Sequence, residues 1–314
     1  MPQRDRSSAV VIVNAAAGSG FTEEWASSLV SQFEQHGIKA AVTLARSGAE
    51  IDQATQSAVA DGCALVVAGG GDGTINAVAS HLVNTDVVLG VLPLGTLNHF
   101  AKDLRIPIEL APAIRTIATG QCIAVDAAEV NSRIFINNSS IGLYPQVVRH
   151  RQQQQRLGRS KWHAFFWATL SVLKRFPFYR ITVVVDGVAR QHKTPFVFIG
   201  NNKYTMEGLQ IGQRDSLQAG QLCFYTARRT GRVGLLLLAC SALLHRLQQA
   251  SNLDVLYATD ITIDTRRSAI RVSTDGEVNV LKPPLHYRIR PAALQVIIPA
   301  TVSALTSTPT LSDT

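Results

Sequence analysis

The sequence lacks any pair of cysteines with the spacing of a metal or redox motif. Its cysteines stand singly at positions 63, 122, 223 and 240, with no C-x-x-C pair, so a zinc site or a dithiol centre has little support. Isolated cysteines in apolar surroundings usually belong to a core. Because a secretory signal is also missing at the start, the sequence predicts a protein of the reducing cytosol.

A run of residues long enough to cross a bilayer is missing as well. The longest apolar run, Val233 to Leu244, has 12 residues, whereas a spanning helix needs about 20. We therefore expect any contact with a membrane to be made from one side.

Charged residues are scarce, and the acidic ones are outnumbered. Of the 314 residues, 17% are charged and 46% are hydrophobic, which leaves ample apolar material for packed cores. The formal net charge is +8. Such a surface attracts anions, whether a nucleotide, a nucleic acid or an acidic membrane, and charge alone does not distinguish among these.

The first part of the chain alternates short β-branched runs with segments of helical pattern. Predicted strands cover residues 9–13, 38–44, 64–68 and 87–92, and predicted helices cover residues 22–36, 49–60 and 75–83. This alternation predicts a mainly parallel sheet with helices on both faces. In such a sheet, ligands bind beyond the carboxyl ends of the strands.

From about Asp126 the pattern changes to short strands and tight turns. Predicted strands cover residues 180–185, 188–192, 195–200, 221–225, 261–264 and 294–298, and predicted helices cover 160–175 and 233–249. Asp186-Gly187 between two strands is a strong hairpin signal. We therefore predict an α/β domain over residues 1–126, a mainly antiparallel β-sandwich domain over 127–300 and a loose tail over 301–314.

A glycine-rich turn, Gly69 to Thr74, follows the third predicted strand and opens the third predicted helix. Glycine lets the backbone approach a ligand closely, and the N–H groups of the turn and of the helix start form an anion site. Asp72 within this turn can cap the helix or bind Mg²⁺ carried by phosphates. The pattern is neither a G-x-x-x-x-G-K-[ST] loop nor a G-x-G-x-x-G turn, and a plain strand-to-helix turn is the alternative.

Two more loops of small residues favour the binding interpretation. Pro93 to Asn98 follows the fourth predicted strand, and Asn14 to Gly20 follows the first. In a parallel sheet both loops emerge at the same edge as Gly69 to Thr74. Three such loops at one edge are difficult to explain by packing alone, so we predict a nucleotide site there.

Together with later motifs, these loops resemble the diacylglycerol kinase catalytic-domain family, and especially the bacterial YegS-type lipid kinases. The matching segments are Asn14 with Gly18, 69–76, 93–101, 125–126, 135–138 and 274–277. The Gly-Gly-Asp-Gly-Thr element alone is shared with NAD kinases, but its combination with Gly-Thr-x-Asn and a late Asp-Gly-Glu is specific to the lipid kinases. The resemblance implies a two-domain fold with the active site in the cleft between the domains, and it implies ATP and Mg²⁺ as cofactors.

The resemblance also implies which residues bind ATP. Most of them belong to the three loops: Asn14, Gly18, Gly70, Gly71, Asp72, Gly73, Thr74, Asn76, Gly95, Thr96 and Asn98. Thr43, taken to follow the second predicted strand, matches a nucleotide contact of the family more loosely.

Three acidic residues carry the chemistry that the resemblance implies. Glu277 matches the family's proposed catalytic base, and a carboxylate is needed there because a lipid hydroxyl is a poor nucleophile until its proton is taken. Asp72 and Asp126 are the implied ligands of a catalytic Mg²⁺, which stabilises the transferred phosphoryl group together with backbone dipoles. A plain hairpin turn is the alternative for Asp275-Gly276-Glu277.

Three positions depart from the family's pattern. His99 stands where Asp is usual, Ala77 where Glu is common, and Ala219 where an Asp belongs to a segment that binds a structural Mg²⁺. Mg²⁺ prefers oxygen ligands to nitrogen, so His99 removes a negative charge from the metal network and Ala219 weakens the case for the structural site. Asp72, Asp126 and the phosphates remain for the catalytic Mg²⁺.

The stretch between Glu129 and Asp186 has no acidic residue and combines basic with aromatic side chains. Such a mixture suits the interface of an anionic membrane. The predicted contacts are Arg156, Arg159, Lys161, Trp162, Phe166 and Trp167. The alternative is a helix that packs its apolar face on the second domain. Binding to nucleic acid has little support, because no recognised module is present.

The sequence therefore predicts a kinase that transfers the γ-phosphate of ATP to a hydroxyl group of a lipid at the inner face of an anionic membrane. Diacylglycerol is the default acceptor, and a sphingoid base or ceramide are the other acceptors. A NAD kinase-like enzyme with a soluble acceptor and a non-catalytic lipid or nucleotide sensor are the alternatives. A homodimer is compatible with the sequence.

Overall fold

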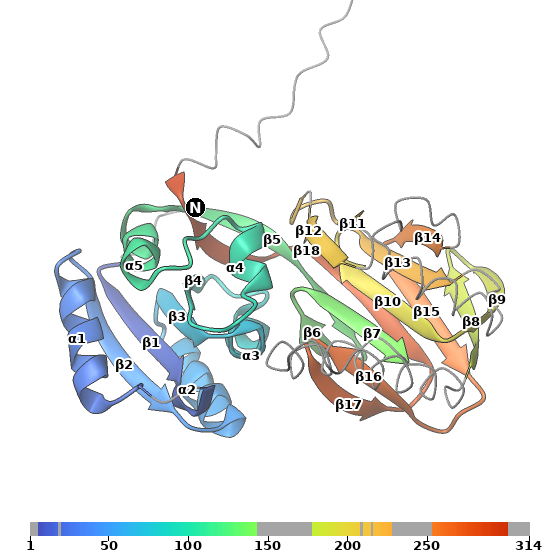
Figure 1. Ribbon diagram of the computed structural model, residues 1–314, viewed down its shortest axis with the longest axis horizontal. Helices are drawn as coiled ribbons and strands as arrows, with labels where there is room; N and C mark the ends of the chain where they lie inside the picture. The colour runs from blue at the N-terminus through green and yellow to red at the C-terminus, as the bar shows by residue number, and fades with distance from the viewer. Residues whose placement is uncertain are drawn as a thin grey trace, which may run out of the picture. The chain divides into compact units, whose positions relative to one another are not determined.

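The computed structural model describes residues 6–17, 20–142, 178–207, 210–214, 216–227 and 253–300. The chain divides into two compact units, one of Met1–Val125 with Ala292–Thr314 and one of Asp126–Pro291 (Figure 1). The first unit thus includes residues 292–300, which the sequence places in the second domain. The predicted helices at 160–175 and 233–249 and the predicted tail lie outside the described residues.

The first unit is built on a parallel sheet with the strand order β2-β1-β3-β4. These strands are β1 (Ser8–Asn14), β2 (Lys39–Ala45), β3 (Leu65–Gly70) and β4 (Val88–Pro93). Every residue of β3 is buried, whereas burial alternates along the edge strand β2. An inner strand that is covered on both faces needs a continuous apolar run. A strand at the edge, with one face less covered, can alternate. The predicted α/β architecture is confirmed.

Five helices and a short 3-10 turn accompany the strands in the described part of this unit. They are η1 (Ala15–Ala17), α1 (Glu23–Glu34), α2 (Gly48–Ala60), α3 (Asp72–Leu82), α4 (His99–Asp103) and α5 (Leu110–Thr119). The buried apolar positions of α3 are Ile75, Val78, Ala79 and Leu82, which form one stripe at helical spacing.

The crossover connections place the helices in two layers. The chain passes from β1 through α1 to its neighbour β2, and then from β2 through α2 to β3 on the far side of β1. Since such connections are right-handed, the reversal of direction puts α1 on one face and α2 and α3 on the other. Contacts between α2 and α3, and between α1 and α5, agree with this division.

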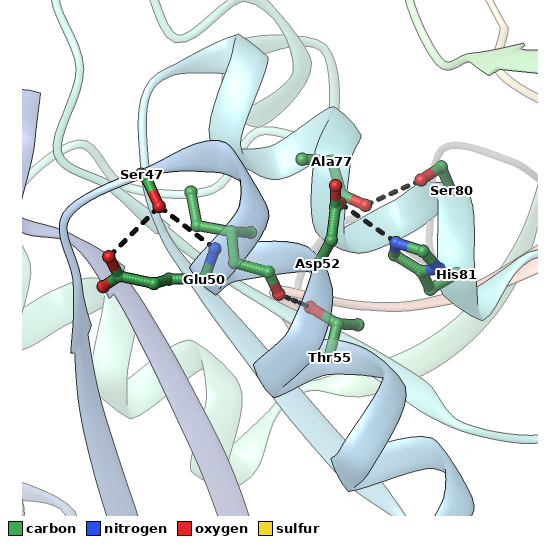
Figure 2. Close-up of polar contacts among 8 residues, drawn as sticks. Ser47, Glu50, Asp52, Thr55, Ala77, Ser80 and His81 are labelled. Atoms are coloured by element: carbon green, nitrogen blue, oxygen red, sulfur yellow. Dashed lines mark hydrogen bonds and ion pairs between the residues drawn. The ribbon is translucent and has the colours of Figure 1, made fainter.

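Side chains also connect α2 to α3, the helix that follows the glycine-rich turn (Figure 2). The Nε2 atom of His81 lies 3.0 Å from the Oδ1 atom of Asp52. At the start of α2, the Ser47 hydroxyl accepts a hydrogen bond from the backbone N–H of Glu50 at 3.2 Å and donates one to its carboxylate at 3.1 Å. The Ser47 cap stabilises the start of α2, and the contact between Asp52 and His81 links α2 to α3.

The second unit contains two antiparallel sheets. The first has the order β14-β13-β10-β7-β16-β17, and the second contains β18-β15-β8-β9 with β5 and β6 attached through β18. The last residues of β18 belong to the first unit and pair with β4 in parallel. The strands are β5 (Gln121–Val130), β6 (Arg133–Phe135), β7 (Asn138–Gly142), β8 (Tyr179–Val185), β9 (Val188–Thr194), β10 (Phe196–Asn201), β13 (Leu222–Ala227), β14 (Leu253–Ala258), β15 (Asp260–Thr265), β16 (Ile270–Thr274), β17 (Glu277–Leu281) and β18 (Leu285–Ile298). A separate pair is formed by β11 (Tyr204–Glu207) and β12 (Gln210–Arg214).

Both sheets contribute to one apolar core, so the predicted antiparallel β-sandwich is confirmed. Representative core residues are Ile141, Val197 and Phe224 from the first sheet and Ile181, Ile261 and Tyr287 from the second. The predicted Asp186-Gly187 hairpin joins β8 to β9, and both turn residues have positive φ, at 50° and 76°. Two positive φ angles are the requirement of the two-residue type I′ turn.

Candidate functional site

The carboxyl ends of β1 and β3 mark the point where the parallel sheet reverses its winding. The two strands are neighbours, yet β1 leads to β2 on one side and β3 leads to β4 on the other. Asn14 ends β1 and Gly70 ends β3. A crevice at such a switch point is the usual binding site of an open α/β sheet.

The glycine-rich segment is tighter than the loop that the sequence suggests. Strand β3 continues through Gly70 and α3 begins at Asp72, so only Gly71 lies between them. The first hydrogen bond of α3 joins the N–H of Ile75 to the carbonyl of Gly71 at 3.0 Å. The N–H groups of the preceding turn therefore remain free of helical partners and can bind an anion.

The neighbouring loop approaches this turn closely through a second glycine. A Cβ atom on Gly95 would lie 2.3 Å from the Cα atom of Gly71, so no larger residue fits there without displacing backbone. The N–H of Leu94 donates to the carbonyl of Gly70 at 3.0 Å. The contact between Gly71 and Gly95 thus joins the loops after β3 and β4 into one surface.

Asn98 gives the second loop its shape. It precedes α4 with a left-handed backbone, at φ 51°. Its side chain accepts from the N–H of Gly95 at 3.0 Å and donates to the carbonyls of Pro93 and Gly95 at 3.2 and 2.9 Å. The side chain is buried, and its hydrogen bonds within the loop give it a role in the shape of the loop.

The Asp72 side chain reaches from α3 to the start of α4. Its Oδ1 atom accepts from the N–H of Phe100 at 3.1 Å, and α3 itself has no side-chain cap. The Oδ2 atom forms no hydrogen bond to another described residue, so one carboxylate oxygen is available. This arrangement fits a single carboxylate ligand for a Mg²⁺ ion.

The rest of a metal shell is not supplied by protein side chains that the structure describes. Over these residues, no three His, Cys, Asp or Glu side chains gather as a metal-binding group. A Mg²⁺ ion here would take its other ligands from nucleotide phosphates and water, as this ion commonly does. His99 is exposed and Ala77 half-buried.

Two amide side chains complete the edge of the sheet. The Nδ2 atom of Asn14 donates to the Thr74 hydroxyl at 3.0 Å and ties the end of β1 to α3. Asn76 is buried on the next turn of α3, and its Oδ1 atom has no hydrogen-bond partner among the residues that the structure describes. Buried polar atoms are rarely left unpaired, so this oxygen marks a place where a ligand or a water molecule would be expected.

The other predicted nucleotide contacts have different outcomes. Thr43 lies inside the edge strand β2, opposite Ile12, and not after the strand, so the prediction of a loop position was wrong. The strand's alternating pattern continues to Ala45 and places the Thr43 side chain on an exposed position. Thr96 is exposed, and a Cβ atom added to Gly73 would meet no described atom within 4 Å outside its chain neighbours and its own helix backbone. Gly18 lies outside the described residues.

Asp126 lies at the start of the second unit, not at the end of the first as predicted, and is almost fully buried. Its Oδ2 atom accepts from the N–H of Gly220 at 2.7 Å, and its N–H donates to the carbonyl of Leu217 at 2.8 Å. The segment around Ala219 is therefore held by hydrogen bonds to Asp126.

Glu277 begins β17, directly after the turn formed by Asp275 and Gly276. Its side chain is exposed, so its carboxylate is accessible for proton transfer. Asp275 behaves differently, since it is half-buried and accepts hydrogen bonds from the N–H groups of Ile136, Asn137 and Asn138 at 2.8 to 2.9 Å. The two carboxylates of the Asp-Gly-Glu motif thus have separate roles.

Burial raises the pKa of Asp275 to about 7, although three backbone N–H groups and the nearby Arg214 guanidinium oppose the shift. An unfolded aspartate loses its proton near pH 4, so between about pH 4 and 7 only the folded protein retains it. The contribution of Asp275 to stability is therefore complete below about pH 4 and is lost as the pH rises to 7.

We expect this dependence to disappear in Asp275→Asn, because asparagine does not titrate. The difference in unfolding free energy, wild type minus Asp275→Asn, is expected to fall by up to about 4 kcal/mol between pH 4 and 7. Urea denaturation at several pH values measures it. A difference that rises with pH would show instead that hydrogen bonding outweighs burial and holds the pKa below its ordinary value.

The sequence did not predict the buried polar residues around Asp275. The side chains of Asn201 and Arg214 both donate to the Ile136 carbonyl, and Asn201 Nδ2 also donates to the Asp126 carbonyl at 2.8 Å. The paired amides at 201–202 after an apolar strand were the available signal. The predicted membrane contacts between 156 and 167 lie outside the described residues, and no helix in the described part is long and apolar enough to cross a bilayer.

Comparison with known families agrees with this division of the chain. The diacylglycerol kinase catalytic domain matches residues 8–130, and the YegS C-terminal NAD kinase beta sandwich-like domain matches residues 140–298. The two matches cover the glycine-rich turn and the Asp-Gly-Glu hairpin, respectively.

Individual relatives match with moderate identity. An uncharacterized protein of Synechocystis is 25% identical over 256 residues, which are 79% of this chain and 58% of that protein. The probable lipid kinase YegS of Escherichia coli is 45% identical over 92 residues, 28% of this chain and 31% of its own length. A probable lipid kinase YegS-like of Yersinia pestis is 29% identical over 74% of this chain and 78% of its own length. The matches to the first two relatives thus span less than two thirds of those proteins.

A solved structure shares the fold. A putative diacylglycerol kinase from Bacillus anthracis aligns with a TM-score of 0.72 at 21% identity, covering 94% of this chain and 98% of that one.

Proposed function

Because the chain belongs to the diacylglycerol kinase family, with matches to its catalytic domain and to the YegS C-terminal domain, we propose that it is a kinase that transfers the γ-phosphate of ATP to a hydroxyl group of a lipid. The observation that carries this proposal is the approach of Gly95 to Gly71 beside the start of α3. It leaves a backbone surface of N–H groups at the switch point of the sheet, where a phosphate chain fits.

The first unit would hold the donor. The free N–H groups of the first turn of α3 would bind phosphate oxygens, and the surface shared by Gly71 and Gly95 would let the phosphate chain lie against backbone. Asn14 fixes Thr74 at the same edge. Asp72 would hold the Mg²⁺ ion carried by ATP, and the ion would neutralise charge on the phosphates.

The second unit would supply the base. As the acceptor oxygen attacks the γ-phosphorus, its proton would pass to the exposed carboxylate of Glu277. A new bond would form between the lipid oxygen and phosphorus while the bond between the γ-phosphorus and the bridging oxygen breaks, and ADP would leave. A carboxylate within hydrogen-bond reach is suited to this transfer.

The acceptor is proposed as diacylglycerol, with a sphingoid base or ceramide as the other candidates. A kinase assay with ATP, Mg²⁺, a panel of these lipids and NAD tests the proposal. We expect a labelled lipid phosphomonoester. Labelled NADP would support a NAD kinase instead, and ATP or lipid binding without any transfer would support a sensor.

The proposed site of action is the inner face of an anionic membrane. The basic and aromatic stretch predicted from the sequence supports this, since each basic residue near such a surface contributes about 1 kcal/mol. Reversing the charge of Arg156, Arg159 and Lys161 to glutamate is expected to abolish binding to vesicles that contain phosphatidylserine. Cosedimentation with these vesicles at about 0.1 M salt measures it.

A second triple charge reversal tests whether vesicle binding depends on these three residues or only on the net charge of the protein. Lys39, Arg46 and Arg115 are exposed in the first unit, and their change to glutamate removes the same charge. We expect that control to bind vesicles nearly as the wild type does. Equal loss in both variants would leave only non-specific attraction, and unchanged binding in the first variant would favour a helix packed on its own domain.

A further inference from the structure

Among the strands that the structure describes, the hairpin that carries Glu277 has a neighbour on one side only. Within this part of the chain, β17 is the edge of its sheet and pairs with β16. Val278 and Val280 on this strand are exposed, at 40% and 67%. An edge strand has a free row of backbone groups and is easily displaced, so the position of Glu277 depends on how the turn before it is held.

The turn is held by the Asp275 side chain. Its Oδ1 atom accepts from the N–H groups of Asn137 and Asn138 at 2.9 and 2.8 Å, and its Oδ2 atom accepts from that of Ile136 at 2.8 Å. The N–H of Asp275 donates to the carbonyl of Asn138 at 2.9 Å. We call these four hydrogen bonds the Asp275 clamp.

The other side of the clamped segment is fixed as well. The carbonyl of Ile136 accepts from the side chains of Asn201 and Arg214 at 2.9 and 2.6 Å. Arg214 also donates to the Asn137 side chain at 2.9 Å, and the Tyr204 hydroxyl donates to the Asn137 carbonyl at 2.9 Å. Buried hydrogen-bond networks of this kind hold one conformation, so the clamp joins the turn to a rigid part of the unit.

A second hairpin in the same unit shows that the turn itself needs no clamp. Asp186 and Gly187 join β8 to β9 with φ angles of 50° and 76°, close to the 47° and 89° of Asp275 and Gly276. Yet Asp186 is exposed, and its side chain forms no hydrogen bond to another described residue. Turn geometry therefore does not explain why the Asp275 side chain accepts hydrogen bonds from three backbone N–H groups.

We propose that Asp275 is a positioning residue for phosphoryl transfer, whose clamp fixes the backbone from which Glu277 takes the proton of the acceptor. This inference rests on the proposed function, because it assigns Asp275 a role only through Glu277. Withdrawing a carboxylate from water costs stability unless it is hydrogen bonded. For the half-buried Asp275, hydrogen bonds from three N–H groups offset this cost and hold the turn next to Glu277.

Four kinase variants test the proposal: Asp275→Asn, the matched Asp186→Asn, Glu277→Gln, and the double variant of Asp275 and Glu277. We expect Asp275→Asn to lower kcat about 10- to 100-fold, as a displaced catalytic group does, with the KM for ATP unchanged. Asp186→Asn is expected to match the wild type. In the Glu277→Gln background, Asp275→Asn is expected to lower the residual rate no further, because the residue through which it acts has already been removed.

Each other outcome has a distinct meaning. Wild-type activity in Asp275→Asn, or an equal fractional loss in both backgrounds, would overturn the clamp proposal while leaving Glu277 as the base. Full activity in Glu277→Gln would overturn both the base and the clamp. If Asp275→Asn is unfolded at the assay temperature, as thermal unfolding would reveal, Asp275→Glu replaces it, since a longer carboxylate keeps the acceptors and moves the turn.

Discussion

Replacing Gly95 with alanine is expected to abolish most of the protein's affinity for ATP. The added Cβ would lie 2.3 Å from the Cα and 3.0 Å from the N atom of Gly71. Both are backbone atoms, so the loops after β3 and β4 must separate, and overpacking of this kind costs about 1–3 kcal/mol of folding stability. We expect the Kd for ATP to rise at least about 10-fold, a loss of about 1.4 kcal/mol, measured by isothermal titration calorimetry.

A glycine in open space provides the control for this change. A Cβ on Gly48, at the start of α2, would meet no atom within 4 Å. Gly48→Ala is therefore expected to keep both the unfolding free energy and the Kd for ATP close to those of the wild type. Normal ATP affinity in Gly95→Ala would contradict the assignment of this surface to the nucleotide.

Replacing Glu277 with glutamine is expected to stop the transfer step while ATP still binds. Glutamine keeps the size and the hydrogen-bonding capacity of the side chain but cannot accept a proton. Loss of a general base typically lowers the rate about 10²- to 10⁴-fold. The KM for ATP is expected to stay the same, because Glu277 lies outside the loops assigned to the nucleotide.

Glu34→Gln is the matched control, since Glu34 is an exposed carboxylate at the end of α1. It is expected to leave kcat unchanged. Steady-state kinetics with varied ATP and a fixed lipid acceptor measure both variants. If kcat in Glu277→Gln equals that of the wild type, another group takes the proton, and the hairpin at 275–277 is structural.

Local sequence patterns were sufficient for the architecture of the first unit. The apolar runs of β1, β3 and β4 are each followed by small residues, and these features arise within about ten residues of chain. The meeting of Asn14 with Thr74 and of Gly71 with Gly95 follows from the rule that parallel strands end at one edge. The strands of such a parallel sheet, and the edge at which its loops meet, can therefore be predicted from the sequence.

The second unit was less predictable because its strands are defined by distant partners. Strand β7, Asn138–Gly142, has the sequence NSSIG, which carries little strand signal of its own. It is a strand because it pairs with β10 and β16. The hydrogen bonds of the Asp275 side chain join residues that are separated by 137 to 139 positions in the sequence. No local sequence pattern distinguishes this turn from the exposed turn at Asp186.

Two residues show what a family pattern leaves out at the level of a single side chain. Asn98 belongs to the Gly-Thr-x-Asn element, yet its hydrogen bonds are made within its own loop. Asp72 was expected to cap its own helix or to bind a metal, and the spacing gave no sign that its Oδ1 atom would accept from the N–H of Phe100 at the start of α4. In both cases the sequence spacing does not show which backbone groups lie next to the side chain in the folded protein.

The most direct measurement follows the γ-phosphate itself. The wild type, Gly95→Ala and Glu277→Gln are incubated with ATP labelled at the γ-position, Mg²⁺ and mixed micelles of diacylglycerol and phosphatidylserine, and the label in the extracted lipid is counted. We predict rapid labelling by the wild type, little by Gly95→Ala at ATP concentrations near the wild-type Kd because ATP binds weakly, and little by Glu277→Gln although ATP binds. A wild type that binds ATP but labels neither diacylglycerol nor ceramide nor a sphingoid base would contradict the account.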